Sequence, residues 1–225
     1  ERGDQPFARP RRTPVTEAAA SALRRPRGRP RKTPDERDEG NRRQQLLGHA
    51  ARLFRLQGYA ATTTRDIAAA AGMRAGSPFY HFESKAALLF AVMEQGMRAA
   101  LQRQAAAVQA VPARAAPQTM LRSLVRAHFD VLLGPGSDFV PVMLYEWRAL
   151  KPAQRDQISK LQRDYEAAWA DVLQALSATG SIRADARVAR LMMLGALNWS
   201  VQWYKPKQGA SLDELTEQAM LLFLP

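Results

Sequence analysis

The stretch TTTRDIAAAAGMRAGSPFYHFESKAALL, residues 62–89, decides the fold expected of this chain. Two runs with helical spacing flank Gly72 and a short segment that contains Pro78. Thr63 and Asp66 have the form of a capping box that opens a helix, and Gly72 suits the left-handed position after a helix end. Helix, glycine turn and short helix in this order are typical of a helix-turn-helix.

The residues on either side of the turn fit that plan. Ile67, Ala68 and Ala71 can pack on the apolar side of a helix over residues 46–57, whose apolar residues recur at 3.6-residue spacing. Residues 74–78 bring short or polar groups to the start of the last helix, where free backbone N–H groups and the helix dipole favour phosphate. Proline is tolerated in that first turn. The stretch is therefore predicted to contact DNA.

The rest of the chain also has helical patterns, and strand-like alternation is missing. We expect an all-α protein of about nine helices, with a three-helix helix-turn-helix domain over residues 41–90 and a larger helical bundle over residues 91–225. Residues 1–40 are rich in Arg and Pro and poor in large apolar side chains, so we expect a disordered basic tail there. The helices expected after the turn cover residues 75–81, 84–109, 117–133, 138–150, 152–178, 185–204 and 211–224.

Charge is concentrated in the first half of the chain. Residues 1–40 hold 11 basic and 7 acidic residues for a net charge of +4, and residues 41–103 hold 9 and 3 for +6, out of +12 for all 225 residues. This asymmetry predicts that the first half contacts a polyanion, with double-stranded DNA favoured. An anionic membrane surface is the alternative, and it usually requires an amphipathic helix with basic residues on one face.

Several classes of function find no support in the sequence. There is no cysteine, no export pattern and no apolar run of the roughly 18 residues that span a bilayer, which fits a cytoplasmic protein without a membrane partner. His49, His81 and His128 are isolated, without metal-ligand spacing, and no catalytic serine elbow or phosphate-binding glycine loop is present. We expect no enzyme, no metal and no cofactor.

The segment GYAATTTRDIAAAAGMRAGSPFYHFESKAALL resembles the N-terminal DNA-binding domain of the TetR family of bacterial repressors, over about residues 41–95. The segment matches the family pattern in register at the Gly-aromatic pair, the Thr-Thr cap, the Ile-Ala pair, the glycine turn and the Ser-Lys start of the next helix. The resemblance implies a homodimer that inserts two recognition helices into a palindromic operator. It also implies that a small ligand in the C-terminal bundle releases the DNA.

The resemblance further implies the residues that contact DNA. Two positions depart from the family pattern: Phe79 stands where a tyrosine usually contacts phosphate, a role that Tyr80 or His81 could take, and Ala75 stands where a longer polar residue is common. Phe79 and Phe82 have core packing as the alternative. The implied DNA-binding residues are Thr63, Arg74, Ala75, Gly76, Ser77, Tyr80, His81 and Lys85.

The basic tail carries one motif of its own, RRPRGRPRK at residues 24–32. Arg27, Gly28, Arg29 and Pro30 resemble an AT-hook, in which arginines enter the narrow minor groove of A·T tracts. A solvated basic tail is the alternative.

The last two expected helices carry the residues for the implied dimer contact. In the family such helices form the interface between the two subunits, whereas internal core packing is the alternative for each side chain. The small or apolar residues concerned are Val188, Leu191, Met192, Gly195, Ala196, Leu215, Ala219, Leu222 and Phe223.

Large aromatic and flexible side chains gather elsewhere in the second half and could line an apolar cavity, with Asn198 as a polar group; ordinary core packing is the alternative. The segment GALNWSVQWYKPKQGASLDEL is similar to family members that control fatty-acid or sterol breakdown, which implies an effector such as an acyl-CoA. Arg148, Lys151 and Arg155 could meet its phosphates, or could simply be solvated. The candidate lining residues are Phe129, Phe139, Met143, Tyr145, Trp147, Tyr165, Trp169, Met193, Asn198, Trp199 and Trp203.

The function predicted from these observations is a ligand-responsive transcriptional repressor. The alternative is an architectural DNA-binding protein that uses the basic tail without a small-molecule effector. The ratio of specific to bulk DNA affinity at fixed salt separates the two.

Overall fold

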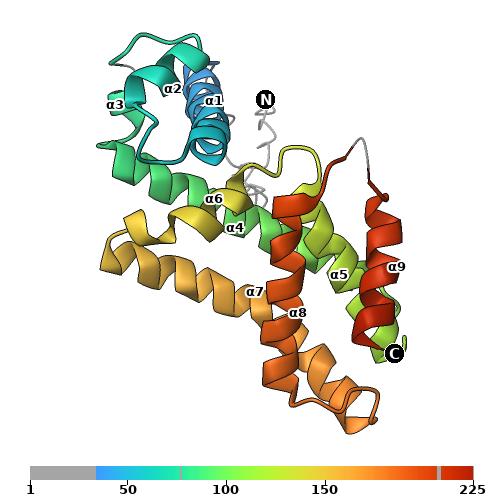
Figure 1. Cartoon of the computed structure of the whole chain (residues 1–225). Helices are drawn as coiled ribbons and strands as arrows, with labels where there is room; N and C mark the ends of the chain where they lie inside the picture. The colour runs from blue at the N-terminus through green and yellow to red at the C-terminus, as the bar shows by residue number, and fades with distance from the viewer. Residues whose placement is uncertain (1–33, 77, 207–208, 225) are drawn as a thin grey trace, which may run out of the picture. The chain divides into compact units, whose positions relative to one another are not determined.

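A computed structural model describes residues 34–76, 78–206 and 209–224 of the chain, with side chains from Gly40 onward apart from that of Phe79. The expected all-α fold is confirmed, because every regular element in these ranges is a helix. Contacts divide the chain into residues 1–38 and 39–225, and the second unit contains the helix-turn-helix and the larger bundle. The helices in Figure 1 are α1 (Pro34–Gln57), α2 (Thr64–Ala70), α3 (Pro78–His81), α4 (Lys85–Ala110), α5 (Pro117–Leu133), α6 (Phe139–Glu146), the 3₁₀ helix η1 (Trp147–Ala149), α7 (Pro152–Ala178), α8 (Ala186–Trp203) and α9 (Leu212–Phe223).

The first helix starts earlier than expected. It begins at Pro34 rather than near Asn41, and its first turns contain four acidic residues. Proline is well suited to the first position of a helix, and carboxylates near the N-terminus interact favourably with the helix dipole. These two local preferences outweigh the lack of large apolar residues before Asn41.

The unit around the glycine turn is built as the spacing predicted. The predicted capping box at the start of α2 is confirmed: the Thr63 side chain accepts the N–H of Asp66, and the Asp66 carboxylate accepts the N–H of Thr63. Ile67 and Ala68 are fully buried. Gly72 has φ +66°, the left-handed conformation expected at the turn.

The larger bundle is arranged around α4 and α5. Helix α4 packs against α5, α6 and α7, while α5 also supports α8 and α9 (Figure 1). The expected boundary between residues 90 and 91 falls inside α4, which continues from the helix-turn-helix into the bundle without a break. Buried apolar side chains from α1 to α9 form one continuous core.

The segment expected as a single helix over residues 138–150 is divided in two. The α-helix α6 ends at Glu146, and η1 follows as a short 3₁₀ turn. Lys151 then adopts an extended conformation, with ψ 155°, in front of Pro152. A residue before proline avoids the helical region, so the chain cannot continue as one helix into α7.

Helices α4 and α6 meet at an unusually close point. A methyl group built on Gly96 of α4 would lie 2.8 Å from Cβ of Phe139 and 3.2 Å from its carbonyl carbon. Only a residue without a side chain leaves room for this approach. The start of α6 is therefore held directly against the backbone of α4.

Candidate functional site

The surface around the glycine turn is polar and open to solvent. Arg74, Ala75 and Gly76 are exposed, and so is 91% of the Tyr80 side chain, whereas His81 is half-buried. A tyrosine so far out of the core gains little from packing within its own chain. The exposed segment in front of α3 is thus available to a partner. The predicted DNA contact Ser77 lies outside the described residues, as do Arg27, Gly28, Arg29 and Pro30.

Lys85 is held by its own chain. Its ammonium group donates to the backbone carbonyls of Tyr59 and Thr62, both at 2.9 Å, and lies 4.3 Å from the centre of the Tyr59 ring. These contacts fix the turn between α1 and α2 to the start of α4. The predicted phosphate contact of Lys85 stays a prediction beside this internal role.

Thr63 is exposed at the N-terminus of α2. Its hydroxyl donates to Asp66 Oδ2 at 2.6 Å, and this hydrogen bond lowers the pKa of the Asp66 carboxyl. The carboxylate is therefore ionised at neutral pH and keeps the cap closed. The capping role is shown by the structure, and the phosphate contact of Thr63 stays a prediction.

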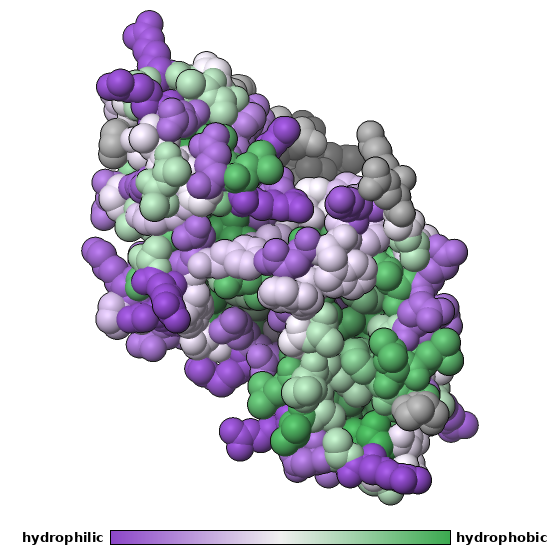
Figure 2. Space-filling view, viewed as in Figure 1, coloured by the Kyte–Doolittle hydropathy of each residue, from purple (hydrophilic) through white to green (hydrophobic). Residues whose placement is uncertain are grey.

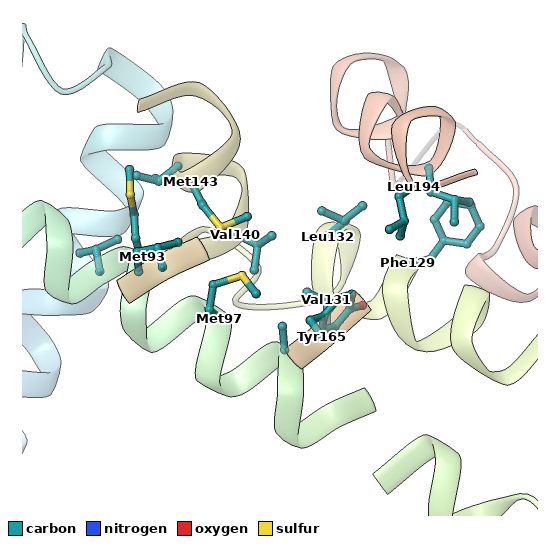
Figure 3. Close-up of a cluster of buried hydrophobic side chains, with 14 of the residues drawn as sticks. Met93, Met97, Phe129, Val131, Leu132, Val140, Met143, Tyr165 and Leu194 are labelled. Carbon is teal, nitrogen blue, oxygen red and sulfur yellow. The ribbon is translucent and has the colours of Figure 1, made fainter. Parts of the chain in front are cut away.

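A second candidate site is a cavity of about 80 Å³ within the bundle. Figure 3 shows Met97 of α4 beside Val140 and Met143 of α6, with Tyr165 of α7 next to Val131 of α5. These apolar side chains are almost fully buried. The cavity is lined by Met97, Ala100, His128, Val131, Val140, Met143, Leu144, Gln162, Tyr165, Glu166, Leu194 and Asn198.

A hydrogen-bonded group of three side chains forms the polar part of this cavity. His128 Nδ1 lies 2.8 Å from the Tyr165 hydroxyl, and Nε2 lies 3.1 Å from Oδ1 of Asn198. Because Oδ1 only accepts, Nε2–H donates to Asn198 and Tyr165 O–H donates to Nδ1. Burial lowers the pKa of His128 to about 4, so the imidazole is neutral at physiological pH.

Three of the predicted lining residues, Met143, Tyr165 and Asn198, come together at the cavity. Phe129 and Trp169 are buried in the core outside it, where the Trp169 indole donates to Gln104 at 3.0 Å. Trp147 lines an adjoining cleft of about 410 Å³ between α6 and α7.

Trp199 and Trp203 are exposed on α8, by 65% and 53%, and do not reach the cavity. His128 also belongs to the cavity, which corrects its interpretation from the sequence as an isolated histidine. Its position four residues after Leu124, on the apolar face of α5, was the available signal.

Helix α6 joins this cavity to the helix-turn-helix. Val140 and Met143 line the cavity, while Glu146, at the end of the same helix, accepts the backbone N–H of Tyr59 at 2.8 Å. At the other end, Arg55 of α1 donates to Asp138 at 2.7 Å. A displacement of α6 would therefore reach the helix-turn-helix through both contacts, Glu146 with Tyr59 and Asp138 with Arg55.

An apolar surface covers the outer side of α8 and α9. Figure 2 shows hydrophobic residues gathered over these two helices. Exposed apolar patches of this kind mark interaction surfaces. The large exposed residues on it are Val188, Leu191, Met192, Trp199, Trp203, Leu221 and Leu222.

Two other kinds of site find no support in the described part of the chain. None of its helices combines the length and the apolar character needed to cross a bilayer. Within the same residues, no three His, Asp or Glu side chains are placed to hold one metal ion.

Two family models match the chain. Residues 46–92 match the model of bacterial regulatory proteins of the tetR family, and residues 114–225 match a tetracyclin repressor-like C-terminal domain. The first match covers the helix-turn-helix, and the second covers α5 to α9.

Individual relatives agree with the family models. The HTH-type transcriptional repressor KstR2 of Mycolicibacterium smegmatis is 30% identical over 189 residues, covering 82% of this chain and 89% of the relative. Among solved structures, AibR in complex with isovaleryl coenzyme A and operator DNA is 28% identical with a TM-score of 0.74, covering 82% of this chain and 98% of that one. The ketosteroid transcriptional regulator KstR2 of Mycobacterium tuberculosis is 26% identical with a TM-score of 0.70, covering 81% and 93%.

Proposed function

Because this chain belongs to the TetR family of bacterial regulatory proteins, we propose that it is a repressor that leaves a palindromic operator when a small hydrophobic effector binds its C-terminal helices. The family consists of DNA-binding transcriptional regulators and not of enzymes. The single observation that carries the proposal is α6, which contacts the helix-turn-helix through Glu146 and lines the cavity through Met143.

The DNA contact is proposed for the exposed segment in front of α3 and for the residues around it. Arg74 supplies a positive charge, and Tyr80 supplies a hydroxyl group that protrudes into solvent. The net charge of +6 over residues 41–103 attracts the phosphate backbone before any base is contacted. Thr63, Gly76, Ser77, His81 and Lys85 complete the proposed surface.

The homodimer is proposed to form through the apolar surface on α8 and α9. Two copies joined there present two helix-turn-helix units, as a palindrome with half-sites about 34 Å apart requires. A second copy of the chain would cover side chains such as Met192 and Trp199, which are exposed in the single chain.

An acyl-CoA thioester is the effector class that we propose. AibR was solved with isovaleryl coenzyme A, and AibR shares this fold over nearly its whole length. Arg148 lines the cleft next to the cavity and is exposed, which supports a contact between its guanidinium and a phosphate-bearing group.

The basic tail is proposed to add a minor-groove contact through Arg27, Gly28, Arg29 and Pro30. A tethered second contact raises the effective concentration of the tail at A·T-rich DNA that flanks the operator.

A regulator of this kind acts where the chromosome is, in the cytoplasm.

Genome-wide footprinting followed by fluorescence anisotropy on the bound sites tests the proposal. We expect specific binding at least about 10³-fold tighter than binding to bulk DNA at the same salt. Arg74→Ala should lower specific affinity about tenfold or more, whereas Arg114→Ala, an exposed arginine in the turn after α4, is the matched control. Equal affinity for all DNA would instead indicate an architectural protein.

A further inference from the structure

The size of the cavity limits what can enter it. Its volume is about 80 Å³, whereas a cavity of about 150 Å³ in another protein holds one benzene molecule. Met97 and Met143 are flexible and can yield a little space, while Val131 and Val140 are stiff. A group of about three to five carbons fits, and a fused ring system does not.

The charges in the cavity limit the chemistry of that group. Glu166 is the charged lining residue, and its Oε2 forms an ion pair with the Arg190 guanidinium at 3.4 Å. His128 is neutral, and both of its ring nitrogens are already used. The neighbouring cation, Arg190, is already paired with Glu166, so a buried carboxylate would have to compete with Glu166 for it, which makes a free acid costly to bind. A neutral carbonyl avoids that cost.

Asn198 offers the hydrogen-bond donor that a neutral carbonyl needs. Its Oδ1 accepts from His128, which fixes the orientation of the amide. The two N–H groups on Nδ2 have no partner among the described residues, and Asn198 lines the cavity. The side chain is thus oriented with a free donor, which is the arrangement that selects a carbonyl oxygen.

A larger and more polar region begins where the cavity ends. The open cleft of about 410 Å³ shares Met143, Leu144 and Gln162 with the cavity and adds Trp147 and Arg148. An aromatic ring and an exposed guanidinium suit a ligand portion that carries phosphate and a flat base. The two volumes together form a site with a small neutral end and a large anionic end.

We infer that the effector is an acyl-CoA thioester with a short acyl group of about three to five carbons, whose carbonyl oxygen accepts a hydrogen bond from Nδ2 of Asn198. The coenzyme portion then leaves between α6 and α7 past Arg148. This inference rests on the proposed function and specifies the effector of that same site.

Calorimetry on the full chain with a series of ligands tests the size limit. The probes are propionyl-, isovaleryl-, octanoyl- and palmitoyl-CoA, a steroid-acid CoA thioester, free isovalerate and CoA itself. We expect isovaleryl-CoA to bind at least tenfold more tightly than palmitoyl-CoA or the steroid thioester, and at least a hundredfold more tightly than free isovalerate. Equal or tighter binding of the long-chain, steroid or free-acid probes would overturn the inference, and so would no binding by any probe.

Variants of Met143 test whether this cavity sets the limit. Met143→Ala enlarges the cavity and should move the preferred acyl chain toward octanoyl-CoA. Met143→Leu nearly conserves the side-chain volume and should keep the wild-type order of preference. An unchanged preference in Met143→Ala would place the acyl group elsewhere. Thermal unfolding of each variant is measured as a control for retention of the fold.

The thioether analogue of isovaleryl-CoA, which lacks the carbonyl oxygen, tests Asn198. Asn198→Ala should weaken isovaleryl-CoA about tenfold and leave the affinity for the thioether unchanged. Equal losses on both ligands would remove the proposed hydrogen bond. Operator binding is measured on the same samples. Specific operator binding with a preference for long-chain or steroid thioesters defeats this inference alone, no acyl-CoA binding defeats the proposed effector class with it, and an absence of operator specificity defeats the proposed repressor.

Discussion

The carboxylate of Glu146 accepts the backbone N–H of Tyr59 at 2.8 Å and so joins the end of α6 to the turn that follows α1. Tyr59 lies directly after Gly58, and its carbonyl accepts a hydrogen bond from Lys85. Tyr59, in the turn between α1 and α2, is therefore held by α6 through Glu146 and by the start of α4 through Lys85. The same α6 carries Met143 into the cavity.

Glu146→Ala should weaken the link between effector and operator. The variant leaves the partly buried N–H of Tyr59 without its acceptor, which costs about 1–3 kcal/mol. We expect the effector to change operator affinity by a factor at least several-fold smaller than in the wild type, as measured by anisotropy with and without ligand. Glu146→Gln keeps an acceptor and should keep most of the response. A full response in Glu146→Ala would show that another contact couples the two sites.

Lys85→Ala should lower the stability of the helix-turn-helix. It removes two charge-assisted hydrogen bonds to the carbonyls of Tyr59 and Thr62, and we expect a loss of about 1.5–3 kcal/mol in urea unfolding. The salt dependence of operator binding decides the predicted phosphate contact, because losing one such contact lowers the slope by about one. An unfolding curve identical to that of the wild type would deny the structural role.

His128 should make stability depend on pH between about 4 and 6.5. Its pKa is about 4 in the folded protein and 6.5 unfolded, so the unfolded chain binds more protons in this window. The contribution of His128 to the free energy of unfolding is complete above pH 6.5 and is lost as the pH drops toward 4, by on the order of 3 kcal/mol. His128→Gln should remove this part of the pH dependence in urea unfolding, and His81→Gln should retain it. A wild-type profile in His128→Gln would assign the effect to other groups.

Met192→Glu should disrupt the proposed homodimer. The side chain is 71% exposed on α8, and a charge there would have to be buried in the subunit interface. Light scattering should show a monomer, and affinity for the palindrome should fall toward that for one half-site. Leu56→Glu, at a similarly exposed apolar residue of α1, should remain dimeric. A dimeric Met192→Glu would assign the apolar surface to another partner.

Deletion of residues 1–33 should reduce operator affinity more when the flanking DNA is A·T-rich than when it is G·C-rich. The deletion removes the arginines of the AT-hook-like motif and keeps Pro34 as the first residue of α1. Narrow A·T minor grooves attract inserted arginine most strongly. Anisotropy on operators that differ only in their flanks measures the difference. Equal losses of affinity for both operators would show that the tail contributes only general electrostatic attraction.

Local signals in the sequence predicted most of the helices. The side chains of Thr63 and Ser84 cap α2 and α4 by accepting a backbone N–H three residues later, and Gly72 adopts the left-handed conformation of the turn after α2. These interactions join residues that are close in sequence, so they can be recognised before the fold is known. The short 3₁₀ helix after Glu146 was missed because it depends on how α6 turns into α7.

The candidate cavity was only partly predictable, because its residues are distant in sequence. His128, Tyr165 and Asn198 come from three helices and are brought together by packing alone. A helical period shows that Trp169 and Trp199 are apolar positions, but it does not show that one is buried and the other exposed. Contacts between helices decide that difference.

The close approach of Gly96 to Phe139 has a genetic consequence. A side chain at this position would force α6 away from α4, and α6 is the helix that we propose the effector displaces from the cavity. We therefore expect a selection for constitutively derepressed alleles to return substitutions at Gly96, which is neither one of the proposed operator contacts nor a residue that lines the cavity.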